Sequence, residues 1–180
     1  TLARNSGSDG IPNFENFEDR YRTAFSPFVT SQKLRNKNHN LFRIHALDDG
    51  EIGTNRYKIS IENLRRSNNK EKPYGKFDLI VRDFNDTDES QLIVLSFKDL
   101  SLDPSSDDFI GKRIGDQRSY FDFDKKEDRQ KFVVDGLYPQ PDINKLIRVE
   151  LNDDVVNGHM DASALPCGFR GMHHLVIAGS

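Results

Sequence analysis

Carboxylate side chains gather between Asp83 and Glu89 and raise the question of a cation site. An EF-hand loop needs oxygen ligands at positions 1, 3 and 5, glycine at position 6 and glutamate at position 12. A loop that starts at Asp83 has Asp88 at position 6 and Val94 at position 12, and one that starts at Asp86 fails in the same way. The segment therefore predicts a solvated turn between two strands, not a calcium site.

Nucleophiles and metal ligands are few. The one cysteine, Cys167, lies between a proline and a glycine, with no helix N-terminus expected nearby to activate it, so we expect a small packed residue. The adjacent His173 and His174 would point to opposite faces of a strand and would not converge on one metal ion. The other histidines are isolated: His39, His45 and His159. We therefore predict no catalytic, cofactor-binding or metal-ligating residue, and no enzyme.

Two glycine motifs and the overall charge do not favour a nucleotide or nucleic-acid partner. Gly111-Lys112 lacks the rest of a phosphate-binding loop, and Gly168-Phe-Arg-Gly171 has only the bare spacing of a KH-type RNA-binding loop. The 26 basic and 29 acidic residues give a net charge of −3 and are interspersed along the chain. We therefore expect no direct nucleic-acid binding. We also expect no membrane insertion, because no apolar run approaches the ~18 residues that a span needs.

Alternating apolar and polar residues predict the strands that would carry these side chains. In residues 57–64, for example, Tyr57, Ile59 and Ile61 alternate with polar residues. The runs Leu79–Val81 and Leu92–Leu95 have no polar face, so we expect both to be covered on both sides. Short polar connections favour antiparallel pairing. The expected strands are 41–47, 57–64, 77–82, 91–97, 119–123, 130–134 and 146–151, with a further strand-like run in 174–180.

Two helices are predicted beside the strands. The clearer one covers 105–114, with Asp103 or Ser105 as its N-cap and Gly115 at its end. Aromatic residues at helical spacing predict another over 14–24, which ends before Pro27. The fold class is therefore α+β, a mixed, mostly antiparallel sheet with a few flanking helices, in one layer or two. Residues 1–13 are expected to be a flexible leader and 14–180 a single domain.

Read in order, several segments resemble the contractile tail sheath proteins of bacteriophages, particularly those of large myophages. The most specific stretch is Tyr74–Asp116, with a Tyr-Gly-x-Phe strand, Val-Arg-Asp, an Asn-Asp-Thr-Asp turn and a Leu-Asp-Pro segment ending in Ile-Gly-Asp. The resemblance covers about residues 14–178. Its other segments are Ala24–Gln32, Leu41–Gly50, Asn55–Ile61 and Leu165–Gly171.

This resemblance implies a structural subunit, cut from the middle of a longer sheath chain and truncated at both ends. Such subunits stack as hexameric rings around a tail tube and contract to drive the tube through the host envelope. The implied partners are copies of the same chain, with the tube and baseplate contacted through other parts of the parent chain. The implied location is the virion, after synthesis in the host cytoplasm. The alternative is a receptor- or carbohydrate-binding β-domain on a virion surface, although the chain has no Trp for sugar stacking.

The residues of the matching motifs look like determinants of the fold. Gly75, Pro104 and Gly115 are expected in turns or caps, and Arg82 is expected to pair with Asp83 or Asp116. The substitution Arg82→Ala should then lower stability more than assembly.

Overall fold

The computed structural model describes residues 23–49, 55–122 and 125–170. Within these ranges the strands pair antiparallel and two short α-helices accompany them, so the expected α+β class with mostly antiparallel sheets is confirmed. The strands are β1 Thr23–Phe25, β2 Val29–Ser31, β3 Asn40–Asp49, β4 Tyr57–Arg65, β5 Lys76–Asp83, β6 Ile93–Ser101, β7 Arg118–Phe121, β8 Phe132–Asp135, β9 Ile147–Leu151 and β10 Pro166–Phe169. The helices are α3 Ile110–Ile114, α4 Asp153–Val156 and the 3₁₀ turn η1 Glu127–Arg129.

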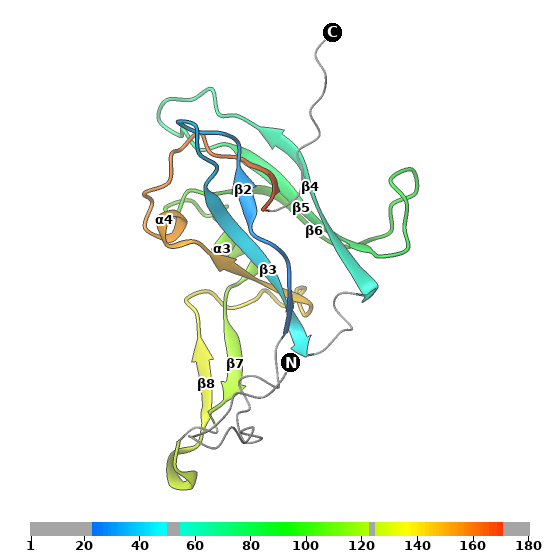
Figure 1. The fold of residues 1–180 in the computed structure, drawn as a ribbon, viewed down its shortest axis with the longest axis vertical. Helices are drawn as coiled ribbons and strands as arrows, with labels where there is room; N and C mark the ends of the chain where they lie inside the picture. Colours follow the sequence, from blue (N-terminus) through cyan, green and yellow to red (C-terminus); the bar gives the residue numbers. More distant parts are fainter. Residues whose placement is uncertain (1–22, 50–54, 123–124, 171–180) are drawn as a thin grey trace, which may run out of the picture.

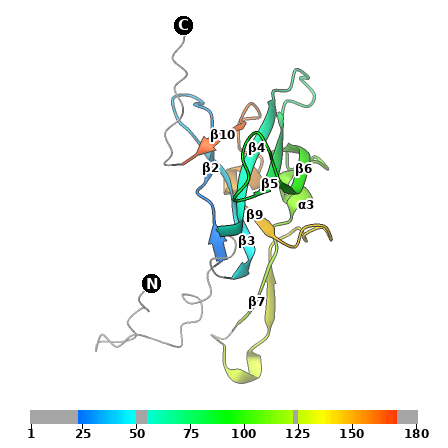
Figure 2. The ribbon, with the colours of Figure 1, turned by 90° about the vertical axis from the view of Figure 1, so that its right-hand side faces the viewer.

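Two sheets form the body of the molecule. In the first, the order is β1-β3-β2-β10, and β9 pairs with the opposite side of β3. In the second, β5 lies between β4 and β6, as expected for two hairpins joined by polar connections. The sheets form two layers, seen side by side in Figure 2. The question of one layer or two is thereby answered in favour of a sandwich.

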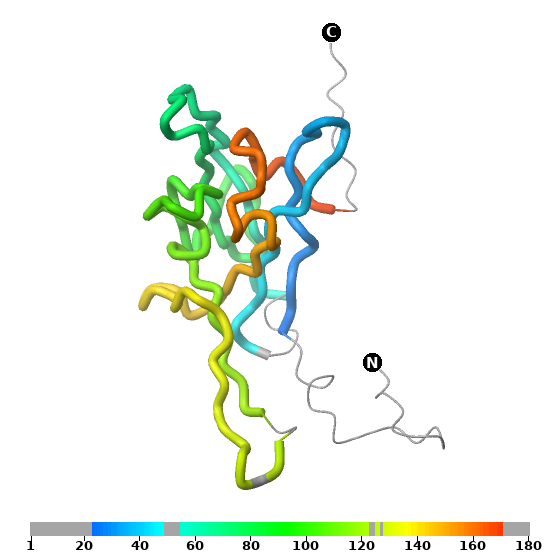
Figure 3. Tube along the Cα trace, turned by 90° about the vertical axis from the view of Figure 1, so that its left-hand side faces the viewer, coloured from blue at the N-terminus to red at the C-terminus, as the bar shows by residue number. Residues whose placement is uncertain are grey.

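The core lies between these two layers. Phe42 of β3 and Phe77 of β5 are fully buried and stack with ring centroids 5.9 Å apart. Alternation along β5 places Leu79 and Val81 on the same inner face. Helix α4 and the loop after it lie between the sheets in Figure 3 and add three further buried side chains, Val155, Met160 and Ala164.

Strands β7 and β8 form a hairpin of their own. It extends from the body in Figure 1, and within the described residues neither strand pairs with the two large sheets. Strand β7 begins at Arg118, shortly after Gly115 ends α3. Gly115 has φ +93°, and an added Cβ would lie 2.6 Å from the Cα of Gln140, so a glycine is required there. The predicted end of the helix is therefore confirmed.

The predicted start of this helix was wrong. Residues 105–108 form turns and a bend, and α3 begins only at Ile110 with Phe109, not Asp103 or Ser105, at the N-cap. The Oδ1 atom of Asp103 accepts both the backbone N–H and the hydroxyl of Ser105, at 2.9 and 2.6 Å. Such local bonds offer the backbone an alternative to the helix.

The second predicted helix, over 14–24, lies mostly outside the described residues. Its last two positions, Thr23 and Ala24, belong to β1, which contradicts a helix there. Pairing with β3 decides this, because Thr23 lies opposite Asp49 and Phe25 opposite His45. The expected leader 1–13 and the expected strand in 174–180 also lie outside the described residues.

The two apolar runs of the second sheet have different surroundings. Leu79–Val81 is buried, as expected for the central strand. The other run was predicted wrongly, because Leu92, Ile93 and Val94 are exposed, with 58% of Leu92 accessible. Strand β6 begins at Ile93 and is at the edge of its sheet within the described residues.

Candidate functional site

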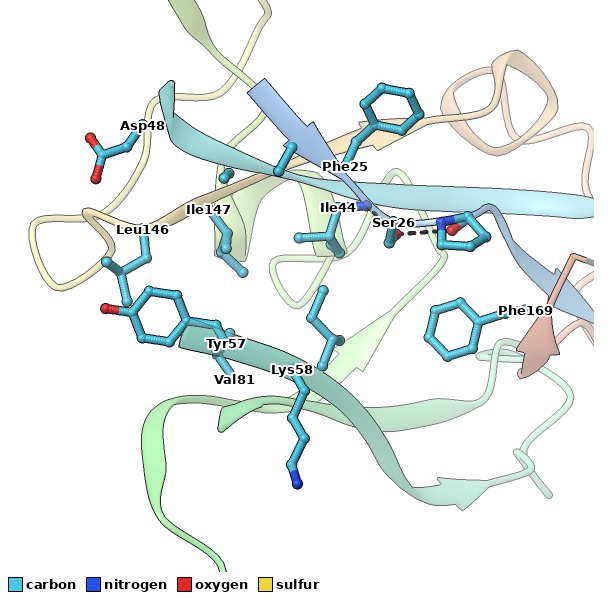
Figure 4. Close-up of a pocket in the computed structure, with 14 residues that line it drawn as sticks. Phe25, Ser26, Ile44, Asp48, Tyr57, Lys58, Val81, Leu146, Ile147 and Phe169 are labelled. Carbon is cyan, nitrogen blue, oxygen red and sulfur yellow. Dashed lines mark hydrogen bonds between the residues drawn. The ribbon is translucent and has the colours of Figure 1, made fainter. Parts of the chain in front are cut away.

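An apolar cleft opens between the two sheets. Its volume is about 350 Å³. Ile44 of β3 and Ile59 of β4 both line it. Figure 4 shows Phe169 of β10 at one end. The cleft exists because β3 and β4 belong to different sheets. The lining side chains are mostly aliphatic or aromatic: Ala24, Phe25, Pro27, Ile44, Ala46, Tyr57, Ile59, Val81, Leu146, Ile147 and Phe169.

The polar groups at the cleft are few and lie at its margin. Asp48 is exposed and lies at the end away from Phe169, while the ammonium group of Lys58 points away from the cleft (Figure 4). That ammonium binds the carboxylate of Asp86, 2.5 Å away, outside the cleft. Among the described lining residues there is no histidine or cysteine to act as base or nucleophile. The mainly apolar lining suits the cleft to binding apolar side chains.

The acidic segment that raised the question of a cation site binds the guanidinium group of Arg82. Arg82 donates from Nε and Nη2 to the two carboxylate oxygens of Asp86, at 2.7 and 2.8 Å, and from Nη1 to Asp88 at 2.9 Å. The predicted pairing with Asp83 or Asp116 is wrong. Asp83 accepts the N–H of Asn85, and Asp116 accepts the N–H of Tyr138.

Asp86 is also buried, although the segment was predicted to be a solvated turn. Hydrogen bonds from Arg82, and then from Lys58 and the N–H of Leu92, hold the pKa of Asp86 well below its usual range, although burial opposes this. The same bond raises the pKa of Arg82. The turn after β5 folds back over the strand and brings Asp86 to Arg82. The spacing of these residues in the sequence does not reveal this contact.

A second polar cluster lies on the outer face of the first sheet. The carboxylate of Glu150 on β9 accepts hydrogen bonds from Arg43 at 2.7 Å and from Nε2 of His45 at 2.6 Å, both on β3. Arg43 lies over the rings of Phe25 and Phe28, at 4.7 and 5.0 Å from their centroids. Alternation along β3 places Arg43 and His45 on the same face, and the register with β9 places Glu150 beside them.

Burial and the neighbouring arginines make His45 neutral. Desolvation, followed by the charge of Arg148, lowers the pKa of His45 to about 4, although the hydrogen bond with Glu150 opposes the shift. Burial would raise the pKa of Glu150, but hydrogen bonds from Arg43 and His45 outweigh it and lower that pKa. Because a carboxylate only accepts, Nε2 of His45 carries the proton in this pair. The cluster fastens β9 to β3.

Outside the cleft, exposed apolar side chains group in two places, apart from the single residues Leu64, Phe84 and Val156. One is the start of β6, described above. The other is the β7–β8 hairpin and the segment that follows it, where 74% of Phe132 and 60% of Val134 are accessible. The exposed side chains of this second group are Tyr120, Phe132, Val134, Leu137 and Ile143. Nothing in the sequence pattern separated these residues from core positions.

The remaining candidates from the sequence are dispersed. Cys167 lies on β10 and is exposed, not packed as expected, with its Sγ 3.9 Å from the Oε1 of Gln32. Gly168 and Phe169 belong to the same strand, so that segment is no helix-flanked RNA-binding loop in the part described. Gly75 is placed by close packing, because an added Cβ would lie 2.6 Å from the carbonyl oxygen of Arg65. His173 and His174 lie outside the described residues.

In the described ranges, no group of three His, Cys, Asp or Glu side chains could hold a metal ion. No helix in those ranges is both long and apolar enough to cross a membrane. Comparison with protein-family models, with curated proteins and with solved structures gave no match.

Proposed function

We propose that this chain is part of a structural subunit of a contractile phage tail sheath, not an enzyme. In this proposal, copies of the parent chain stack as hexameric rings around a tail tube and contract to drive the tube through the host envelope. The domain contacts other copies of itself, while other parts of the parent chain reach the tube and baseplate. Its place is the virion, after synthesis in the host cytoplasm. The motif resemblance of Tyr74–Asp116 supplies the family.

The observation that carries the proposal is the exposure of apolar side chains on strand edges and on the β7–β8 hairpin. Soluble monomers seldom expose contiguous apolar patches, and edges of sheets are templates for pairing with another chain. Phe132, Val134 and Leu92 are each more than half exposed. A subunit that is surrounded by copies of itself would cover such residues.

The body of the domain suits a contractile array. Its two sheets share a core, the buried Arg82–Asp86 pair holds the β5–β6 turn against β5, and the Arg43–Glu150 pair joins β3 to β9. Contraction in such an array is a rearrangement of rigid subunits between two packings, and packed bodies of this kind switch between discrete arrangements instead of deforming continuously.

Electron microscopy of the polypeptide from the full reading frame that contains this sequence tests the proposal. We expect striated hollow tubes in negative stain, and shorter, wider tubes after treatment with dilute urea. A polypeptide that stays monomeric at high concentration, or one that binds a defined glycan on an array without polymerising, overturns the proposal. The glycan result would favour the receptor-binding alternative.

A further inference from the structure

A second cleft, the polar cleft, lies at the end of the first sheet where β3 begins and β9 ends. Its volume is about 440 Å³. The lining comes from β2 and its connection to β3, from the segment around the start of α4, and from the residue after β10. Every lining residue has a polar or charged side chain, so a ligand of this cleft has to be polar. Six of them carry the argument: Thr30, Lys37, Asn38, Asn152, Asp154 and Arg170.

Backbone hydrogen bonds hold the lining segments together. The N–H of Asn152 donates to the carbonyl of Leu41 at 2.9 Å, and the N–H of Arg170 donates to the carbonyl of Phe28 at 2.7 Å. Lys37 ends a tight turn in the β2–β3 connection, which two backbone hydrogen bonds of 2.9 and 3.0 Å close. The side chains therefore extend from a preformed scaffold, and a ligand does not have to order the backbone before it binds.

Two cationic side chains line the polar cleft without a counter-ion among the described residues. Lys37 and Arg170 are exposed, and neither forms an ion pair or a side-chain hydrogen bond within that part of the chain. Asn152 adds a further donor, because its Oδ1 atom already accepts the N–H of Asp154 at 3.0 Å and its NH₂ group is left to donate. Charged donors of this kind favour an oxyanion, with which they form strong hydrogen bonds.

The polar cleft also presents acceptors, which a simple inorganic anion would not use. The carboxylate of Asp154 is exposed and has no ion pair within the described ranges. The amide nitrogen of Asn38 donates to the carbonyl of Ser31 at 2.9 Å, so its Oδ1 atom can accept. The hydroxyl of Thr30 donates to the carbonyl of Gly168 at 3.2 Å and keeps lone pairs that can accept. A ligand that matches both sets carries hydroxyl groups together with an anionic group.

We propose that the polar cleft binds an acidic sugar, with its carboxylate held by Lys37 and Arg170 and its ring hydroxyls donating to Asp154 and Asn38. The volume is within the range of about 300–1,000 Å³ that is common for small-molecule sites. The cleft forms within one copy of the chain, so the inference goes beyond the proposed function and does not rest on it. Because these cations are exposed and compete with water for the ligand, we expect affinity in the millimolar range.

Titration of the isotope-labelled chain with D-glucuronate, followed by heteronuclear NMR, tests the site. We expect saturable shifts of the amide signals of Lys37, Asn152 and Arg170. Two control ligands each lack half of the match, since glucose has hydroxyls without charge and cyclohexanecarboxylate has charge without hydroxyls. Each control should bind about ten-fold more weakly. Cyclohexanecarboxylate or glucose that binds as tightly as glucuronate would overturn the proposal.

Substitutions test the residues assigned to the carboxylate. Lys37→Met and Arg170→Gln should each weaken glucuronate binding about ten-fold, because each removes a charged donor. The matched control is Lys33→Met, since Lys33 is an exposed lysine of the same connection that does not line the polar cleft. The midpoint of urea unfolding should be the same in all three variants, because these side chains are exposed. Unchanged binding in the first two variants, or an equal loss in the control, would overturn the assignment.

Methyl β-D-glucuronide separates two sources of the sugar. Its anomeric position is blocked, as in a glycan chain, so binding equal to that of glucuronate supports an acidic glycan as the source. Binding that is lost on blocking supports the free sugar acid. Both results support the site, because both require the carboxylate and the ring hydroxyls.

Tube formation and glucuronate binding can be measured on the same parent polypeptide, which separates this inference from the proposed function. Tubes from a polypeptide that does not bind glucuronate would overturn the sugar site and leave the sheath proposal standing. Binding by a polypeptide that stays monomeric would do the reverse.

Discussion

The two-sheet body and the β7–β8 hairpin use the same residue types for opposite purposes. In the body, Phe42 and Phe77 are fully buried against each other, because a second layer of the same chain lies over each sheet. In the hairpin, Phe132 also packs on another phenylalanine, yet most of its surface is accessible. The comparison teaches that one aromatic neighbour does not bury a phenylalanine, and that a second layer of side chains over the sheet is needed. The body is stabilised by contacts within its own chain, whereas most of the Phe132 side chain stays exposed.

The largest expected effect is from Phe42→Ala in the body. Removing a buried aromatic ring leaves a cavity opposite Phe77, and such changes lower the free energy of unfolding by about 3–5 kcal/mol. Urea unfolding followed by circular dichroism measures this. The matched control is Phe84→Ala, half exposed in the β5–β6 turn, where we expect a change within about 0.5 kcal/mol. Equal losses in the two variants would contradict the assignment of Phe42 to the core.

The next effect is from Arg82→Ala, which leaves the buried carboxylate of Asp86 with Lys58 as its remaining cation. Because an underpaired buried charge is costly, the melting temperature should fall more than in the exposed control Arg113→Ala. Tube formation by the protein that remains folded should persist. The opposite pattern, an unchanged melting temperature with lost assembly, would place Arg82 at an interface between copies and not inside the body.

A smaller effect should appear as pH dependence of the body. Unfolded His45 binds a proton near pH 6.5, whereas the folded protein keeps it neutral down to about pH 4. The unfolded state therefore binds more protons between these values, and stability falls as the pH falls from 6.5 to 4. In His45→Gln this part of the slope should disappear. Urea midpoints at several pH values give the comparison, and parallel slopes for the two proteins would refute the contribution of His45.

The smallest effect on stability is expected in the hairpin. Phe132→Ser removes an exposed ring, so the free energy of unfolding should change by no more than about 0.5 kcal/mol. Assembly should nevertheless be reduced, because we propose that neighbouring copies cover this exposed ring. Unfolding in urea and pelleting of polymers from the parent polypeptide measure the two effects, with Phe84→Ser in the β5–β6 turn as control. A large loss of stability with normal pelleting would show that the hairpin belongs to the body in its energetics.

Most strands could be predicted from alternation alone. Tyr57, Ile59 and Ile61 pack against the core as expected, and β9 lies within the predicted 146–151. The helix start failed because Asp103 bonds to Ser105 and holds the turn. Ala24 joined β1 instead of the predicted helix, because β3 offers an edge to pair with.

The polar clusters were partly visible in the sequence. Arg82 and the acidic segment were both noted, but the choice of Asp86 required the backbone to turn back over β5. Glu150 could not be linked to Arg43 and His45, because strands β3 and β9 are far apart in the chain and their register follows from packing. The cleft gave no local signal at all. Its lining comes from strands of both sheets, including β10 of the first, and from connecting segments.

The sequence by itself determined where most of the described strands form and where Gly115 ends α3, because both depend on residue type and spacing along the chain. The tertiary structure alone decided which apolar residues are buried. Leu79–Val81 and Leu92–Val94 look alike in the sequence, yet the first lies in a central strand and the second at a sheet edge. The physical reason is that burial depends on a second layer, which residues distant in the sequence supply over Leu79–Val81 but not over Leu92–Val94.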